Sequence, residues 1–240
     1  MSFILQIVLA LLILSWLSIY LAEKRNIFRI WITPVKQRLN EFYFGFVLMG
    51  TLSLLTQLLF TLIHGTNWTI SDELTISKFL YSSAYDFSSV VFEELLFRGV
   101  LLYLLIAYLN EHKAIAISAI AFGIYHWFTY GIWGNLLGMT LVIITTGFMG
   151  YVFAKAYSKT NSVMLPIGLH IGWNWINNSV FSNGPNGNVF LLPNQTLLPN
   201  QTFAMEGYIG LFSFLWFLII PATVLFLLNM NVLGAFRSKI

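Results

Sequence analysis

Three ionisable side chains interrupt a long apolar stretch of this chain, and any fold has to accommodate them. The only charged residues in the segment 87–109 are Glu93, Glu94 and Arg98. On an α-helix Glu94 and Arg98 lie four residues apart on one face and can pair, whereas Glu93 points about 100° away. Each charge at the centre of a membrane helix costs about 2.5 to 3.5 kcal/mol on insertion scales. We therefore expect all three side chains to face a protein interior.

The composition indicates a membrane protein. The 240 residues are 58% hydrophobic and 9% charged, with a mean hydropathy of +0.78, whereas a soluble domain has roughly 25% charged residues. The chain has no cysteine, which excludes disulfides and a cysteine nucleophile. The net charge of +3 is explained by basic residues that are sorted to one side of a membrane, and nothing indicates nucleic-acid binding.

Apolar runs predict an all-α membrane protein, a bundle of about seven transmembrane helices with an intramembrane polar cavity, in a single domain, 1–240. The first run lacks a signal-peptide cleavage pattern, so we expect a retained anchor. Gly138, Gly147 and Gly150 would allow close helix packing, and Pro166 would start or kink a helix. The expected spans are 3–22, 42–63, 84–108, 114–130, 134–154, 162–181 and 207–230.

Two polar segments, 64–80 and 182–206, are expected to lie outside the membrane on one side. The second contains a tandem repeat, Leu-Pro-Asn-Gln-Thr-Leu (192–197) followed by Leu-Pro-Asn-Gln-Thr-Phe (198–203). We interpret this repeat as a turn-rich linker, because Pro and Asn favour turns.

The basic residues predict an orientation. Of the 12 lysines and arginines, ten fall in alternate loops that begin with 23–40, and Lys78 alone falls on the opposite side. The positive-inside rule then places the N-terminus outside and the C-terminus in the cytoplasm. Short loops and the lack of a soluble domain are compatible with a bacterial cell membrane.

Two histidines and an asparagine are the candidate partners of Glu93. His126 lies in the fourth expected span and His170 in the sixth, where one polar cavity could hold them. Asn174 follows His170 by four residues, so both can donate hydrogen bonds to a single point. Taken singly, each could instead link helices, with an average value of about 0.6 kcal/mol. Asp86 could cap the third helix or enter the cavity.

Three motifs occur in order on successive expected helices: Glu93-Glu94-x-x-x-Arg98-Gly99, Phe122-Gly123-x-x-His126 and His170-x-x-x-Asn174. Together they resemble the CPBP family of intramembrane proteases. That family includes the CAAX-processing endopeptidases of eukaryotes and the bacteriocin-processing and immunity proteins of bacteria, also called the Abi family. The resemblance covers residues 80–180, which we expect to form the catalytic core.

The resemblance implies an intramembrane endopeptidase. By this resemblance, Glu93 activates a water that attacks a peptide carbonyl, and His126 assists. The resemblance gives His170 and Asn174 the stabilisation of the oxyanion. The implied partners are membrane lipid and a peptide or membrane-anchored protein substrate. In a bacterial membrane we expect a leader-bearing peptide, a bacteriocin or a pheromone precursor.

The supporting role in this resemblance falls on Glu94 and Arg98, which neutralise each other.

Two alternatives stay open. The set Glu93, His126 and His170 would suit zinc with an open position for water, although no H-E-x-x-H helix is present; we favour metal-free chemistry and expect no cofactor. A non-catalytic immunity factor, scaffold or proton-coupled transporter would use the same groups, but transporters usually show internal repeats that are not evident here.

Overall fold

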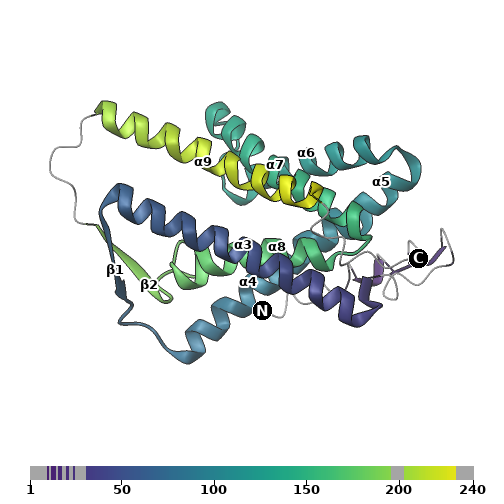
Figure 1. The fold of residues 1–240 in the computed structure, drawn as a ribbon, viewed down its shortest axis with the longest axis horizontal. Coiled ribbons are helices and arrows are strands. Elements are labelled where there is room, and N and C mark those ends of the chain that lie inside the picture. Colours follow the sequence, from purple (N-terminus) through teal and green to yellow (C-terminus); the bar gives the residue numbers. More distant parts are fainter. Residues whose placement is uncertain are drawn as a thin grey trace.

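The computed structural model describes residues 31–195 and 203–230, together with a few positions between 10 and 24. This part of the chain contains seven α-helices, two π-helical segments and two short strands (Figure 1). Most of the expected first span, 3–22, and the basic tail 231–240 lie outside the described residues. The all-α prediction therefore holds for the bundle, with a small sheet that it did not include.

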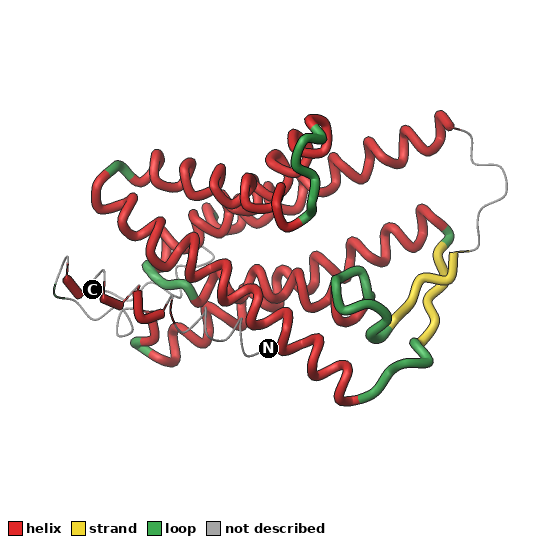
Figure 2. Tube along the Cα trace, turned by 180° about the vertical axis from the view of Figure 1, so that it is seen from behind, coloured by secondary structure: helices red, strands yellow, loops and turns green. Residues whose placement is uncertain are grey.

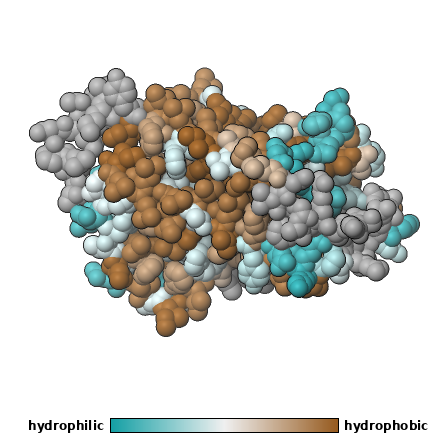
Figure 3. All heavy atoms as spheres, in the orientation of Figure 1, coloured by the Kyte–Doolittle hydropathy of each residue, from teal (hydrophilic) through white to brown (hydrophobic). Residues whose placement is uncertain are grey.

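Three described helices are long and apolar enough to cross a membrane. They are α3 (Val35–His64), α7 (Leu136–Thr160) and α9 (Phe203–Asn229, of which Ile209–Asn229 qualifies), and they match the second, fifth and seventh expected spans. Large hydrophobic side chains such as Val47 and Phe226 are exposed on them. Figure 3 shows a broad hydrophobic surface in the middle of the molecule, with hydrophilic residues toward its two ends.

The third expected span is one continuous helical segment with an internal π turn. It consists of α4 (Ile76–Glu94), η1 (Leu95–Leu101) and α5 (Leu102–Tyr108). The segment starts earlier than the expected residue 84, because Thr75 caps α4 by accepting a hydrogen bond from the backbone N–H of Lys78. α4 is not among the helices that qualify as spans by length and composition.

Two further expected spans are also shorter or more polar than a typical crossing. α6 (Glu111–Thr129) is capped by the side chain of Asn110 and packs along α7. α8 (Met164–Asn174) and η2 (Trp175–Val180) form the sixth span, and the residues from Leu165 to Gly172 are all buried. α8 lies among α3, α4 and α7 (Figure 1). The view from behind shows the helices as the bulk of the molecule, with the short sheet at one end (Figure 2).

The packing of α3 against α8 brings one backbone against the other. A Cβ atom at Gly168 would lie 2.1 Å from the carbonyl oxygen of Phe42, and one at Gly172 would lie 2.4 Å from that of Phe46. Gly150 of α7 packs as expected, because a Cβ there would lie 3.0 Å from Phe122. The expectation for Gly138 was wrong: its nearest neighbour is its own capping residue, and its N–H bonds that side chain.

A two-stranded antiparallel sheet joins the two polar segments. β1 (Thr66–Ile70) pairs with β2 (Leu191–Gln195). The prediction of a turn-rich linker is therefore wrong for the first copy of the repeat, whose residues 192–195 form a strand. Both strands are edges, so Pro193 can be accommodated without loss of an internal ladder bond. The second copy lies almost entirely outside the described residues.

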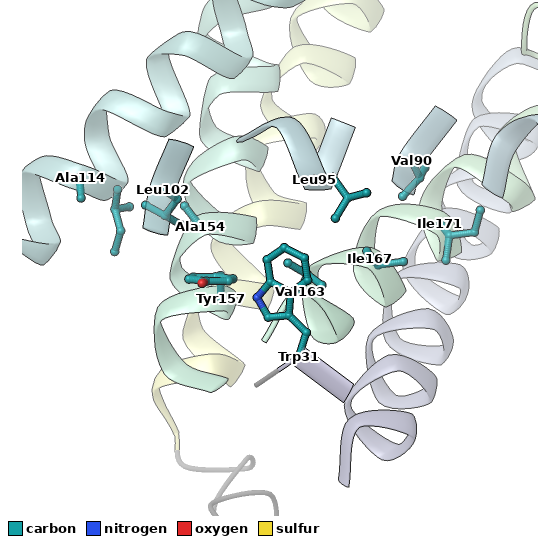
Figure 4. Packing of buried hydrophobic residues seen from close by; sticks show 11 residues of the cluster. Trp31, Val90, Leu95, Leu102, Ala114, Ala154, Tyr157, Val163, Ile167 and Ile171 are labelled. Carbon is teal, nitrogen blue, oxygen red and sulfur yellow. The ribbon is translucent and has the colours of Figure 1, made fainter. Parts of the chain in front are cut away.

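A buried hydrophobic cluster packs α4 and η1, the segment that carries the two glutamates, against α8. Val90 of α4 and Leu95 of η1 belong to the same cluster as Ile167 and Ile171 of α8, and the ring of Trp31 lies among them (Figure 4). These side chains are nearly inaccessible from outside the protein, and between membrane helices such close van der Waals packing is a main source of attraction. This packing fixes the two helical segments that carry the expected catalytic groups.

The helix termini that the charge pattern predicts on the basic side of the membrane lie together at one end of the bundle. Lys155 of α7 bonds Glu111 of α6 at 2.7 Å, and Arg38 of α3 donates to the carbonyl oxygen of Thr160 at 3.0 Å. Arg38, one of the basic residues counted in the segment 23–40, is buried and bonds Glu41 at 2.7 Å. The orientation of this end in the membrane stays a prediction.

Candidate active site

Glu94 and Arg98 form the expected ion pair across one helical turn. Arg98 Nη1 lies 2.9 Å from Glu94 Oε1, and both side chains are fully buried. The guanidinium also donates from Nη2 to the carbonyl oxygen of Gly150 at 3.0 Å. Its carbon lies 4.4 Å from the ring centre of Phe122 and 5.3 Å from that of Phe153, which adds cation–π attraction in a desolvated site.

His170 of α8 joins this pair. Its Nδ1 lies 2.8 Å from the same oxygen, Glu94 Oε1, and its ring stacks on Phe153 with centroids 4.9 Å apart. A carboxylate paired with a guanidinium accepts hydrogen bonds and donates none. The Nδ1 of His170 therefore carries a proton, and the ring is held with Nε2 directed toward Glu93 at 3.9 Å.

His126 of α6 is oriented by its own helix. Its Nδ1 lies 2.8 Å from the carbonyl oxygen of Phe122, and the two rings are 4.5 Å apart. A carbonyl oxygen only accepts, so Nδ1 is the protonated nitrogen and Nε2 presents a lone pair in the neutral ring. The four-residue spacing of Phe122 and His126 in the sequence was the signal for this contact.

Glu93 lies between the two histidines. Its Oε2 is 4.0 Å from His126 Nε2 and 3.9 Å from His170 Nε2. This oxygen is buried and has no hydrogen-bond partner among the described residues. The structure thus brings Glu93 together with both histidines that the sequence singled out, although they come from helical segments far apart in the chain.

A cavity of about 250 Å³ adjoins this cluster. Its polar wall includes His126, His170 and Asn174, so the predicted asparagine shares a cavity with both histidines. Apolar side chains from α6, α7, α8 and α9 complete the lining, among them Phe122, Met149, Phe153, Trp173, Phe217 and Ile220. Glu93 is not part of this lining.

Some contacts of the site were not evident in the sequence. The carbonyl of Gly150 and the aromatic rings around Arg98 carry no polar signal, and the bond from His170 to Glu94 joins residues far apart in the chain. Asp86 takes neither of the two expected roles, because it neither caps α4 nor lines the cavity. It accepts hydrogen bonds from Asn178 and Ser179 instead.

Glu93, His126 and His170 converge without forming a zinc site in this arrangement. Zinc holds nitrogen and oxygen ligands at about 2.0 to 2.2 Å in a tetrahedral set. Within the described part of the chain, no group of three or more His, Cys, Asp or Glu side chains is arranged to hold a metal ion. Metal-free chemistry stays a prediction, and removal of metal by a chelator tests the zinc alternative.

Comparison with known families agrees with the motifs. Residues 75–176 match the family described as type II CAAX prenyl endopeptidase Rce1-like. No curated protein and no solved structure matches the chain significantly. The matched range contains all four expected catalytic residues together with Glu94 and Arg98. The segment that carries the site, residues 75–176, thus matches the Rce1-like group of the CPBP, or Abi, family.

Proposed function

We propose that the chain is an intramembrane endopeptidase that hydrolyses a peptide bond with a water activated by Glu93. The observation that carries the proposal is the position of Glu93 Oε2, which is buried and lies 4.0 and 3.9 Å from the Nε2 atoms of His126 and His170. These separations exceed a direct hydrogen bond, and the proposal places the attacking water next to these groups. The family match supports the same reaction class.

Glu93 is the proposed base, and His126 assists it. The lone pair of His126 Nε2 and the ionised carboxylate of Glu93 are both acceptors. A water that donates one hydrogen to each keeps a lone pair for attack on the carbonyl carbon. As the new C–O bond forms, the water proton passes to Glu93, and it moves to the leaving amine when the C–N bond breaks.

His170 and Asn174 are the proposed donors to the oxyanion. The Nδ1 proton of His170 is committed to Glu94, so Nε2 has to carry a second proton in order to donate. The resulting imidazolium is stabilised by the carboxylate of Glu94. The buried cluster then holds two carboxylates and two cations and is neutral overall, which limits the cost of burying it.

The proposed substrate is a peptide or a membrane-anchored protein that reaches the site from the membrane. We propose a leader-bearing peptide, a bacteriocin or a pheromone precursor of a bacterial membrane. The matched family is named for prenylated CAAX substrates, so these form the second class to be compared. The largely apolar cavity supports a hydrophobic side chain beside the bond that is cleaved.

The proposal is tested with purified protein in lipid nanodiscs and a mixture of synthetic peptides of both classes, with products identified by mass spectrometry. We expect the parent to cleave at least one class and Glu93→Gln to lose about a hundredfold or more in rate. Glu73→Gln, which alters an exposed carboxylate outside the bundle, is the matched control and should cleave normally. Equal cleavage by Glu93→Gln would overturn the proposal. A folded parent that cleaves no peptide favours the non-catalytic alternative.

Chelation separates glutamate chemistry from zinc chemistry. If Glu93 is the base, cleavage should persist after exhaustive treatment with a strong chelator. If zinc is required, its removal should abolish cleavage and its return should restore it. Stoichiometric zinc in the purified protein with this behaviour would replace the glutamate mechanism by the metal alternative.

A further inference from the structure

A buried carboxylate outside the proposed catalytic set joins the two segments that carry that set. Asp86 lies in α4 seven residues before Glu93, which is two turns along the same helix face. It is 1% exposed and does not line the cavity. Both of its oxygens are bonded: Asn178 Nδ2 donates to Oδ1 at 2.9 Å, and Ser179 Oγ donates to Oδ2 at 2.6 Å.

The two donors lie in η2, directly after the proposed oxyanion residues. Asn178 follows Asn174 by four residues within the π-helical turn, and Asn174 follows His170 by four residues along α8. The segment with α4 and the segment with α8 and η2 thus touch at two places. Asp86 contacts η2 close to Asn174, and Glu93 lies near His170 of α8. Hydrogen bonds to an ionised carboxylate are roughly twice as strong as neutral ones. These bonds oppose sliding or rotation of α4 relative to α8 and η2.

A second contact reinforces the first. Ser82 Oγ and Ser179 Oγ are 2.8 Å apart, and both side chains are buried. Asn186 of the loop after η2 donates to Ser82 at 3.0 Å. We call Ser82, Asp86, Asn178 and Ser179 the polar clamp. An ionisable group in such a bundle is costly unless it serves a site or fixes a specific arrangement, and the polar clamp adds directional hydrogen bonds to the apolar packing of the two segments.

We propose that Asp86 is a positioning residue, which holds Asn174 and His170 at their working distance from Glu93 through the polar clamp. The inference rests on the proposed function. A displacement of catalytic groups by 1 Å typically lowers the rate about a hundredfold. Because the clamp lies outside the cavity lining, its loss should lower kcat and leave KM nearly unchanged.

The cysteine-free sequence allows the clamp to be replaced by a reversible covalent bond. Asp86→Leu should lower kcat about a hundredfold on the synthetic peptides, and Asp86→Asn, which keeps one acceptor, should lie between it and the parent. Adding Ser82→Cys and Ser179→Cys to Asp86→Leu puts two sulfurs in place of oxygens that lie 2.8 Å apart. Oxidation should then restore most of kcat, and reduction should remove it again. A role in folding alone would not respond to oxidation of an already folded sample.

A second measurement does not depend on turnover. With fixed oxidant, the pair Ser82→Cys and Ser179→Cys should form its disulfide about tenfold more slowly when Asp86→Leu is added, because the remaining bond from Asn178 to Asp86 no longer holds the segments together. Equal disulfide rates with and without Asp86 would overturn the inference, as would an oxidised variant that stays as slow as the reduced one. Failure of the proposed function is distinguishable, since Glu93→Gln would then cleave like the parent while the disulfide rates still report on the clamp.

Discussion

Among single residues, Glu94 organises the site and Glu93 is free to react. One oxygen of Glu94 accepts from Arg98 at 2.9 Å and from His170 at 2.8 Å, so it sets the position of both. Glu93 Oε2 has no such bond within the described residues. Two adjacent carboxylates thus have different environments, which suits one for structure and the other for proton transfer.

The first prediction compares these roles by stability. Arg98→Ala leaves Glu94 as an unpaired buried charge, which typically costs about 3 to 5 kcal/mol, so its thermal unfolding in detergent should occur well below that of the parent. Glu93→Gln should unfold like the parent although it does not cleave. Lys113→Ala, a change of an exposed cation, is the control. If Arg98→Ala is as stable as the parent while Glu93→Gln is degraded, the two roles are reversed.

The second prediction concerns Asn174. An oxyanion donor acts mainly in the transition state, so Asn174→Ala should lower kcat by about a hundredfold or more and change KM little. Steady-state kinetics on the best synthetic peptide measure both constants. Asn183→Ala, at an exposed position beyond η2, should match the parent. A rise in KM with unchanged kcat would show that Asn174 only binds substrate.

At this scale, local spacing predicted what lies on one helix and could not predict what lies between helices. The pairing of Glu94 with Arg98 and the contact of His126 with Phe122 follow from a separation of four residues. The bond between His170 and Glu94 depends on how α8 is placed against α4. That placement results from packing, which leaves no periodic signal in either segment.

Among the elements, α8 determines the geometry of the site because it is buried on all sides. Its glycines allow α3 to approach until backbone meets backbone, and its short length lets η2 follow inside the bundle. The sequence contains the signal for this packing, Gly168-x-x-x-Gly172, since small residues four apart are typical of close membrane helices. The predicted span 162–181 is helical, but the structure divides it into α8 and the π-helical η2. A hydropathy pattern does not show such a change of helix type, and it does not distinguish a buried helix from one that crosses the membrane.

The third prediction tests that packing. In Gly168→Ala the new methyl group would lie 2.1 Å from the carbonyl oxygen of Phe42, so the helices must separate and stability should fall by about 3 kcal/mol or more. Gly210→Ala is the matched control in α9, because no atom lies within 4 Å of the added carbon, and it should be neutral or slightly stabilising. Thermal unfolding measures both. An unchanged Gly168→Ala variant would contradict the backbone contact of α3 and α8.

The fourth prediction is a pH effect at the contact of α6 and α7. The pKa of Glu111 is lowered by hydrogen bonds from Lys155, first, and from Ser158. A lowered folded-state pKa stabilises the fold above the unfolded-state value of about 4.3, and this stability is lost as the pH falls through the folded-state pKa. Because Glu111 is partly exposed, we expect less than about 1 kcal/mol.

The measurement is thermal unfolding of the parent and of Glu111→Gln between pH 7 and acid. The parent should be slightly more stable at pH 7, and the two curves should converge in acid. Lys155→Gln should give the same loss at pH 7, and the double variant should add little to it, because both changes remove one interaction. A difference that persists in acid would show that Glu111 acts through packing and not through its charge.

Across the whole molecule, helix ends expected on the same side of a membrane lie together. The end with Arg38 and Thr160 also holds Glu111 with Lys155, while the β1–β2 sheet ties the two polar segments of the opposite side. Charge counting predicted this alternation. Charge counting could not predict how many segments cross a membrane. Only three helices within the described residues qualify by length and composition. The segments α4, α6 and α8 are shorter or more polar, because they carry the side chains of the site.

The last prediction fixes the orientation. The positive-inside rule counts lysine and arginine, and acidic partners contribute little, so pairing of Arg38 and Lys155 with glutamates does not weaken the expectation that their end is cytoplasmic. The lack of cysteine permits single labelling sites at exposed positions, Pro185→Cys in the loop after η2 and Lys36→Cys at the start of α3. An impermeant thiol reagent should label Pro185→Cys in intact cells and Lys36→Cys only after the membrane is opened. Labelling of Lys36→Cys in intact cells, with Pro185→Cys protected, would show that the orientation is the opposite of the predicted one. The polar clamp would then lie toward the cytoplasm.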